Sequence, residues 1–461
     1  MKFKNYLDKK FKITEKGSTI KTELGAGFIN FLVTCYVMIV IPSILIKNNS
    51  QVVFSALFIG TVISIVVCTF AIGVFANTPL VYAPGIGIAS YAASLIASGT
   101  YTYDQVLVIV LVSAIVFVLL TVFKLRDKLV NAIPDFIKDC MPIGIGLFIA
   151  TLGLGDNSGI LTFLSQGPLA ETASGLPVWT SALVCLVSLT VIMCFHLKNI
   201  KGSIFYGIIA GTIVNIVVLL CMGQNPLSPL TSGNWIPNFG EFFSSGVFKY
   251  DFAGVFTAKS NLISSILNFV IVVYAFTLVD IFDTVGTVIG ISKRANLYDE
   301  NGKIQNMNRI MYVDSLSGVF GSMVGVPTCT AYIESTAGIE SGGRTGLSSV
   351  FTSLLFLVCL FLSPLVMIIP TAATSGALIF VGILMVSGIK DLKFENYYTI
   401  IPAFFTILLM PLTSNISYGI AGGMISYSTI MLFTGKGKQV NALTYVCSIL
   451  FAIFFVTQGI F

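Results

Sequence analysis

Long apolar stretches alternate with short polar segments along the whole chain. Most of these stretches approach the roughly 20 residues that a helix needs to cross the hydrocarbon core of a bilayer. The pattern predicts fourteen spans, at residues 22–46, 51–77, 80–98, 104–123, 137–156, 177–197, 203–222, 262–291, 308–326, 328–341, 345–368, 373–389, 397–411 and 416–434. A further apolar stretch, 441–459, fits either a fifteenth span or a helix at the membrane interface.

Composition supports this interpretation. Of the 461 residues, 56% are hydrophobic and 10% are charged, whereas charged residues make up about 25% of an ordinary soluble domain. These values predict an all-α polytopic membrane protein, with the lipid bilayer as its surroundings. The net charge of +5 does not indicate nucleic-acid binding, because the lysines and arginines gather in short loops between spans.

The basic residues also predict the orientation of the spans. Their clusters follow even-numbered spans, and basic loops mark the cytoplasmic side of a membrane protein. The lysine-rich tail 1–21 is therefore expected in the cytoplasm, and segment 223–260, which is poor in basic residues, outside. The first span is too long for a signal peptide and lacks a small-residue cleavage site. We expect a multi-pass protein of the cell membrane with an uncleaved, cytoplasmic N-terminus.

Several kinds of site have no sequence support. The nine cysteines occur singly, without a CxxC pair, so neither a disulfide framework nor a zinc site is indicated. The single histidine, His196, lies at a predicted helix end beside Lys198, which argues against a metal site. The GxxxxGK[ST] pattern of a nucleotide-binding loop is missing from the sequence. We therefore expect no cofactor, and ATP-driven transport has no support in this chain.

Two short matches relate the halves of the chain. Residues 203–211 (SIFYGIIAG) match residues 415–423 (NISYGIAGG). An Ile-Pro pair followed by a glycine also occurs once in each half: Ile133, Pro134 and Gly146, then Ile369, Pro370 and Gly382. Because seven spans carry a chain to the opposite side of the membrane, a repeat of seven spans is inverted. Inverted repeats are a common plan of secondary transporters, whose site lies near the membrane midplane.

Two spans at corresponding places are short and interrupted by glycine and proline. They are residues 79–97 in the third span and 325–340 in the tenth, and in each an extended stretch precedes a short helix. Irregular backbone at membrane depth is tolerated only inside protein or beside a cavity. The free N–H groups at the start of such half-helices can face a polar ligand.

Three carboxylates lie within these apolar regions. Asp280 and Asp283 occur three residues apart in the eighth span, on one face of a helix, and Glu334 lies near the start of the second half-helix. A charged residue at the centre of a spanning helix costs roughly 2.5–3.5 kcal/mol on insertion scales. We therefore interpret the three as a polar site at membrane depth.

Their expected roles differ. Glu334 can accept hydrogen bonds from ligand N–H groups, or merely cap its own helix. Burial and a nearby like charge both disfavour an ionised carboxylate, so Asp280 and Asp283 are candidates for carrying a proton, or else form a structural polar pair. Thr284 is more typical of helix packing than of ligand binding. Asp314 in the ninth span fits a structural and a functional role equally well.

These residues are also where a family becomes recognisable. The chain resembles the AzgA-like purine permeases of the nucleobase–cation symporter group, within the xanthine/uracil permease superfamily, from about residue 10 to 440. The segments that carry the resemblance are VDIFDTVGTVIG (279–290), AYIESTAGIESGGRTGLSSV (331–350), APGIG (83–87) and MPLTSNISYGIAGG (410–423).

The resemblance implies a 14-span, seven-plus-seven inverted-repeat fold with a core and a gate domain, in which spans 3 and 10 are the half-helices. The implied parts are a tail at 1–21, core segments at 22–123 and 251–368, gate segments at 124–250 and 369–434, and a hydrophobic C-terminal segment at 435–461. It also implies a transporter rather than an enzyme, and frequently a homodimer.

The implied activity is proton-coupled import of hypoxanthine, guanine or adenine. Proton coupling would rest on Asp280, Asp283 and Glu334. The implied substrate-binding residues are Glu334, Asp280, Asp283, Ala89, Ser90, Ser335 and Thr284.

The chain departs from the family pattern at two places. The family usually carries an asparagine two residues after the GxG of the third span, where this chain has Ala89, and Asn-Pro near the end of the first span, where this chain has Ile41-Pro42. The third-span asparagine is associated with substrate binding, so the preferred purine is expected to differ. Ser90 is the neighbouring residue that can compensate in part.

Two other functions fit the sequence less well. A carrier for another nucleobase or a small anion can share the same fold, but three acidic residues and no basic residue in the site argue against an anion. A membrane prenyltransferase would use aspartates to hold Mg²⁺ and a diphosphate. Such an enzyme needs two acidic clusters and basic partners, and the sequence has one close acidic pair.

Overall fold

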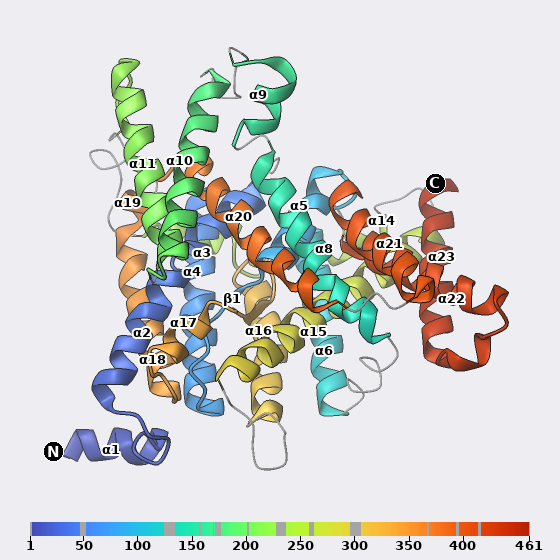
Figure 1. Ribbon diagram of the computed structural model, residues 1–461, viewed down its shortest axis with the longest axis horizontal. Helices are drawn as coiled ribbons and strands as arrows, with labels where there is room; N and C mark the ends of the chain where they lie inside the picture. The colour runs from blue at the N-terminus through green and yellow to red at the C-terminus, as the bar shows by residue number, and fades with distance from the viewer. Residues whose placement is uncertain are drawn as a thin grey trace.

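The computed structural model describes residues 2–46, 52–123, 134–155, 158–168, 170, 177–200, 202–226, 237–257, 262–295, 306–366, 368–392, 396–413 and 416–460. Within them the protein is helical apart from one two-stranded sheet (Figure 1). The α-helices and strands are α1 (Lys2–Phe11), α2 (Ile20–Thr34), α3 (Val37–Ile46), α4 (Phe54–Ala71), β1 (Tyr82–Pro84), α5 (Ile86–Ala97), α6 (Tyr103–Val122), α8 (Asp135–Leu154), α9 (Ile160–Gln166), α10 (Val178–Leu197), α11 (Ser203–Cys221), α13 (Phe239–Ser245), α14 (Phe252–Thr257), α15 (Leu262–Ala295), α16 (Met307–Met323), β2 (Cys329–Ala331), α17 (Ser335–Glu340), α18 (Gly346–Cys359), α19 (Ser363–Val366), α20 (Thr371–Val386), α21 (Tyr397–Thr413), α22 (Ile416–Phe433) and α23 (Ala442–Ile460).

Each predicted span contains a helix at its place in the chain. Among the described residues, seven helical segments are long and apolar enough to cross a membrane by length and composition: Ile20–Ile46, Phe54–Ala76, Tyr103–Val122, Asp135–Leu154, Val178–Leu197, Ser203–Cys221 and Thr371–Lys390. The apolar stretch 441–459 forms α23, which packs against α22 and α15. The short helices α1, α9, α13 and α14 lie outside the predicted spans. Their sequences carry no long apolar run, which explains why the pattern did not reveal them.

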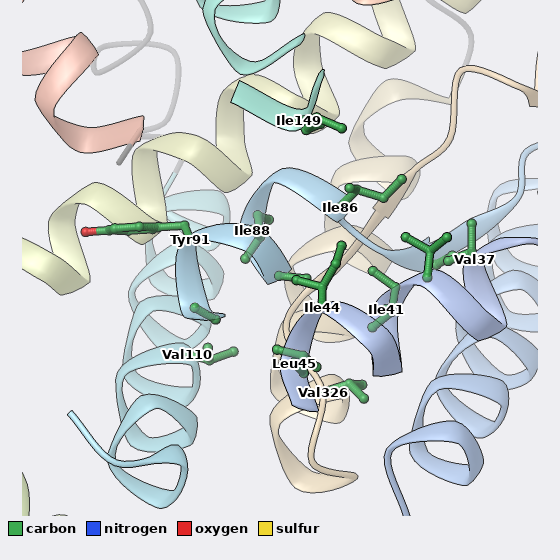
Figure 2. Packing of buried hydrophobic residues seen from close by; sticks show 14 of the residues in the cluster. Val37, Ile41, Ile44, Leu45, Ile86, Ile88, Tyr91, Val110, Ile149 and Val326 are labelled. Carbon is green, nitrogen blue, oxygen red and sulfur yellow. The ribbon is translucent and has the colours of Figure 1, made fainter. Parts of the chain in front are cut away.

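The first span is interrupted, which the apolar run did not predict. Helix α2 ends at Thr34, α3 begins at Val37, and Cys35 and Tyr36 form a turn between them. Helix α3 then packs beside α5 in an apolar cluster that also includes Val326 (Figure 2). Ile41, one of the two departures from the family pattern, is fully buried there, so the place of the usual asparagine is filled by a packing residue.

The internal repeat is visible in the way that helices meet. Pro134 and Pro370, matched in sequence, are the residues immediately before α8 and α20. Further along, Gly146 and Gly382 face one another where these two helices cross: a Cβ on Gly382 would lie 2.6 Å from the carbonyl oxygen of Gly146, and one on Gly146 would lie 2.9 Å from that of Gly382. Only a residue without a side chain fits at this crossing, in both halves.

The second match behaves in the same way. Gly207 of α11 lies directly against Ile192 of α10, and Gly419 of α22 lies directly against Met410 of α21. In each half, the glycine therefore permits close contact between the last helix and the helix before it. The sequence repeat corresponds to repeated structure.

Contacts between helices fall into two sets. One set contains α2 to α6 together with α15 to α18, and the other contains α8, α10 and α11 together with α20, α21 and α22. In Figure 1, α10, α11 and α20 lie together, and α15 and α16 lie beside α6. Residues far apart in the chain are thus neighbours within each set.

Candidate functional site

The two interrupted spans meet as an antiparallel pair of short strands. Tyr82 of β1 pairs with Ala331 of β2, and Pro84 pairs with Cys329. One further bond extends the ladder beyond each end of β1, because the Gly85 amide donates to the Thr328 carbonyl and the Tyr332 amide donates to the Val81 carbonyl, both at 3.0 Å.

Each strand leads into a short helix, α5 after β1 and α17 after β2. Because the strands are antiparallel, the two half-helices begin at opposite ends of one ladder. The expected extended stretch before each half-helix is confirmed.

Glu334 lies at the start of α17 and is half-buried. Its Oε1 accepts a hydrogen bond of 2.8 Å from the hydroxyl of Tyr36, the residue in the break of the first span. The break turns this tyrosine, which is 1% exposed, toward the second half-helix. Tyr36 was not predicted as a site residue, because a tyrosine in an apolar run gives no sequence signal of its partner.

Asp283 of α15 lies against the other half-helix. Its Oδ2 accepts a hydrogen bond of 3.1 Å from the hydroxyl of Thr330 in β2, and a Cβ on Gly85 would lie 3.2 Å from the same oxygen. Asp283 is half-buried, and it interacts electrostatically with Glu334. The structure therefore brings these two carboxylates, both of them candidate site residues from the sequence, beside the paired strands β1 and β2.

Asp280 lies deeper in the protein than Asp283. It is 2% exposed and interacts electrostatically with Asp283 and with Asp314 of α16. Asp314 is fully buried, and its Oδ1 accepts a hydrogen bond of 2.8 Å from Thr284. Thr284 thus donates a hydrogen bond to a carboxyl of the neighbouring helix α16. Asp314 therefore belongs with Asp280 and Asp283 to one group of interacting carboxyls.

The other predicted site residues have different positions near the paired strands β1 and β2. Ser335 accepts a hydrogen bond of 2.9 Å from the Val81 amide and donates one of 2.6 Å to the Tyr332 carbonyl, so its hydroxyl ties the two extended stretches together. Ala89 and Ser90 are buried on α5. Within the described part of the chain, the Ser90 hydroxyl has no hydrogen-bond partner. Buried hydroxyls are normally paired, which makes this one a candidate contact for a ligand.

A hydroxyl group faces each of three carboxyls: Tyr36 on Glu334, Thr330 on Asp283 and Thr284 on Asp314. A hydroxyl can donate or accept, so these contacts persist whether the carboxyl is ionised or protonated. A lysine or arginine partner would instead favour the charged form. Across the described ranges, histidine, cysteine, aspartate and glutamate form no group of three or more that could hold a metal ion.

Comparison with known proteins adds the following. The sequence pattern of the permease family matches residues 21–422. Adenine permease AdeQ of Escherichia coli (strain K12) is 34% identical over 455 residues, covering 97% of this chain and 95% of that protein. Guanine/hypoxanthine permease PbuO of Bacillus subtilis (strain 168) is 33% identical over 462 residues, covering 96% of this chain and 99% of that protein.

Solved structures show the fold. The transmembrane domain of the bicarbonate transporter BicA from a cyanobacterium matches with a TM-score of 0.58 at 17% identity, covering 94% of this chain and 97% of that chain. The chain therefore has the seven-plus-seven inverted-repeat transporter fold.

Proposed function

The chain belongs to the xanthine/uracil permease family, and from this membership we propose that it imports a purine nucleobase by symport with a proton. As a multi-pass permease it is a transporter and not an enzyme. The relatives are named for adenine and for guanine/hypoxanthine, which supports adenine, guanine or hypoxanthine as the cargo.

The observation that carries the proposal is the position of Glu334 and Asp283 beside the paired strands β1 and β2. Both are half-buried, whereas Asp280 and Asp314 are almost fully buried behind them. A purine is planar and carries ring N–H groups, which a carboxylate accepts with stronger hydrogen bonds than a neutral group does. We assign Glu334 and Asp283 to substrate binding, with Ser90 as an additional polar contact.

We assign binding of the coupled proton to the more deeply buried carboxyls. Asp280 interacts electrostatically with both Asp314 and Asp283, so a proton bound by one carboxyl relieves the repulsion felt by the others. Hydroxyl partners tolerate this change of charge, because a hydroxyl can donate to a carboxylate or accept from a protonated carboxyl. Proton transfer among Asp280, Asp283 and Glu334 thereby provides a physical link between proton binding and the substrate site.

The two sets of helices support alternating access. We propose that residues 22–123 and 251–368 form a core that moves against a gate formed by 124–250 and 369–434, because the helices at the predicted spans contact one another mainly within each of these two groups. The site lies within the core, on both of its half-helices. A plasma-membrane location with a cytoplasmic N-terminus belongs to the same proposal, and the homodimer stays a prediction.

The experiment is uptake of labelled hypoxanthine, guanine, adenine, xanthine and uracil by cells without nucleobase permeases of their own. Uptake of a purine that collapses when a protonophore is added is the expected result. Uptake that persists with the protonophore would reject proton coupling. If the protein reaches the membrane and none of the five bases enters, the purine assignment is wrong.

A further inference from the structure

The first span contacts the second half-helix region at three successive points. Glu23 of α2 is fully buried, and its carboxylate oxygens accept hydrogen bonds from the amides of Arg344 and Thr345, at 2.8 and 3.3 Å. Asn30 accepts one of 3.1 Å from the Gly338 amide in α17. Tyr36 then donates to Glu334. These bonds connect the first span to the loop after the second half-helix, to the middle of that helix and to its start, in this order.

Asn30 and Gly338 are in direct contact. Asn30 is fully buried, and the three atoms nearest to a Cβ added at Gly338 all belong to its amide group. Asn30 and Glu23 are seven residues apart, so they share one face of α2. The face of α2 that carries Asn30 therefore packs against α17 and the segment that follows it, and Gly338 allows the close contact between α2 and α17.

A short helix needs such support. Helix α17 has six residues, too few to hold its own geometry, since isolated helices shorter than about 12–15 residues are marginal in water. Glutamate has a long side chain with several rotamers, and fixing it lowers the entropy lost when a ligand binds. A hydrogen bond to one carboxylate oxygen and a bond to the backbone one turn further along together fix where the carboxylate lies.

We propose that Tyr36 and Asn30 are positioning residues of the substrate site: Tyr36 orients the Glu334 carboxylate, and Asn30 holds the half-helix that carries it. This inference rests on the proposed function. The first span then contributes to substrate affinity through Glu334, even where its own side chains do not touch the purine.

The test compares Tyr36→Phe with wild type in purine uptake, with the amount of protein at the membrane measured for each. Losing a hydrogen bond to a charged group typically weakens an interaction about tenfold or more. We expect the KM for the transported purine to rise by about tenfold, with the maximal rate per molecule nearly unchanged. A purely structural role would instead reduce the amount of folded protein and leave KM as it was.

Tyr101→Phe is the matched control. Tyr101 is also buried, at 2% exposed, and its hydroxyl accepts a hydrogen bond of 3.0 Å from Asn268, away from Glu334. The same change at Tyr101 should leave KM within about twofold. Asn30→Ala gives a second, independent variant, with a KM increase in the same direction and of smaller size.

The outcomes separate this inference from the function itself. Wild-type protein that imports no purine would reject the proposed function. Wild-type import with an unchanged KM in both Tyr36→Phe and Asn30→Ala would leave the function standing and overturn the positioning roles.

Discussion

The two half-helices occupy corresponding places in the repeat, yet the carboxylate near the start of each one comes from a different part of the chain. Helix α17 carries its own carboxylate, Glu334, at its first turn. Helix α5 begins at Ile86, immediately after Gly85, and has small neutral residues, Ala89 and Ser90, in its first turns. The carboxylate beside the start of α5 is Asp283, which comes from α15 and lies against Gly85. The start of each half-helix is therefore adjacent to one carboxylate, which belongs to a side chain at the helix's own start in one case and to a side chain of a neighbouring helix in the other.

This difference shows which features the repeat has retained. The shared parts are backbone features: a strand, a short helix after it, and glycines at equivalent helix contacts. The charged side chains follow no repeat symmetry, because Asp280, Asp283 and Glu334 all lie in the second half of the sequence. The duplicated backbone forms the frame of the proposed site, and the second half of the sequence supplies its acidic residues.

The largest effect is expected from removing the charge of α17. Glu334→Gln keeps the shape of the side chain but replaces the charged acceptor with a neutral amide. Losing a charge-assisted hydrogen bond and leaving its partners poorly paired should lower uptake by about a hundredfold or more, with normal expression. Uptake of labelled purine measures this. The control is Glu15→Gln in the exposed tail, which should transport normally; full transport by Glu334→Gln would remove this residue from the site.

Asp283→Asn tests whether the carboxylate beside α5 is equivalent. We expect uptake to fall by about tenfold to a hundredfold, because the amide can still accept from Thr330 but no longer carries the charge that faces a ligand N–H. Asp135→Asn is the matched control, since this aspartate is at the surface and 94% exposed in its side chain. An effect as large as that of Glu334→Gln would make the two half-helix sites functionally equal. No effect would confine substrate binding to α17.

The sequence revealed the residues whose presence in a membrane is costly, but not their partners. Long apolar runs indicated the spans, and carboxylates inside those runs indicated a candidate site. The donor to Glu334 lies 298 residues away in the chain, and the donor to Asp283 lies 47 residues away. Neither spacing corresponds to a helical or strand period, so only the folded chain identifies these pairs. The break at Cys35 was equally invisible, since no glycine or proline occurs between residues 28 and 41 to mark it.

Ala89→Asn tests the neutral character of α5. The substitution introduces the asparagine that the family usually carries at this position. The amide of an asparagine on α5 offers both a donor and an acceptor to a purine. We expect the ranking among adenine, guanine and hypoxanthine to change, with about a tenfold change in relative KM for at least one base. Competition by unlabelled bases for uptake of one labelled base measures the ranking. An unchanged order would make the substitution incidental to specificity.

The smallest effect is expected from Ser90→Ala, and it distinguishes a backbone role for α5 from a side-chain role. The Ser90 hydroxyl is 1% exposed and has no partner in the described part of the protein, and an unpaired buried hydroxyl costs about 1–3 kcal/mol. Removing it should therefore leave thermal stability unchanged or raise it. If the hydroxyl binds the purine, KM should rise about threefold to tenfold at the same time.

The control on the same helix is Ser94→Ala. The Ser94 hydroxyl donates to the Tyr91 carbonyl at 2.8 Å, so its loss should change neither KM nor substrate ranking. Higher stability together with weaker substrate affinity in Ser90→Ala alone would show that a group left unpaired in the fold is used by the ligand. Unchanged affinity would mean that α5 offers the purine only its backbone, so that side-chain binding rests with α17 and α15.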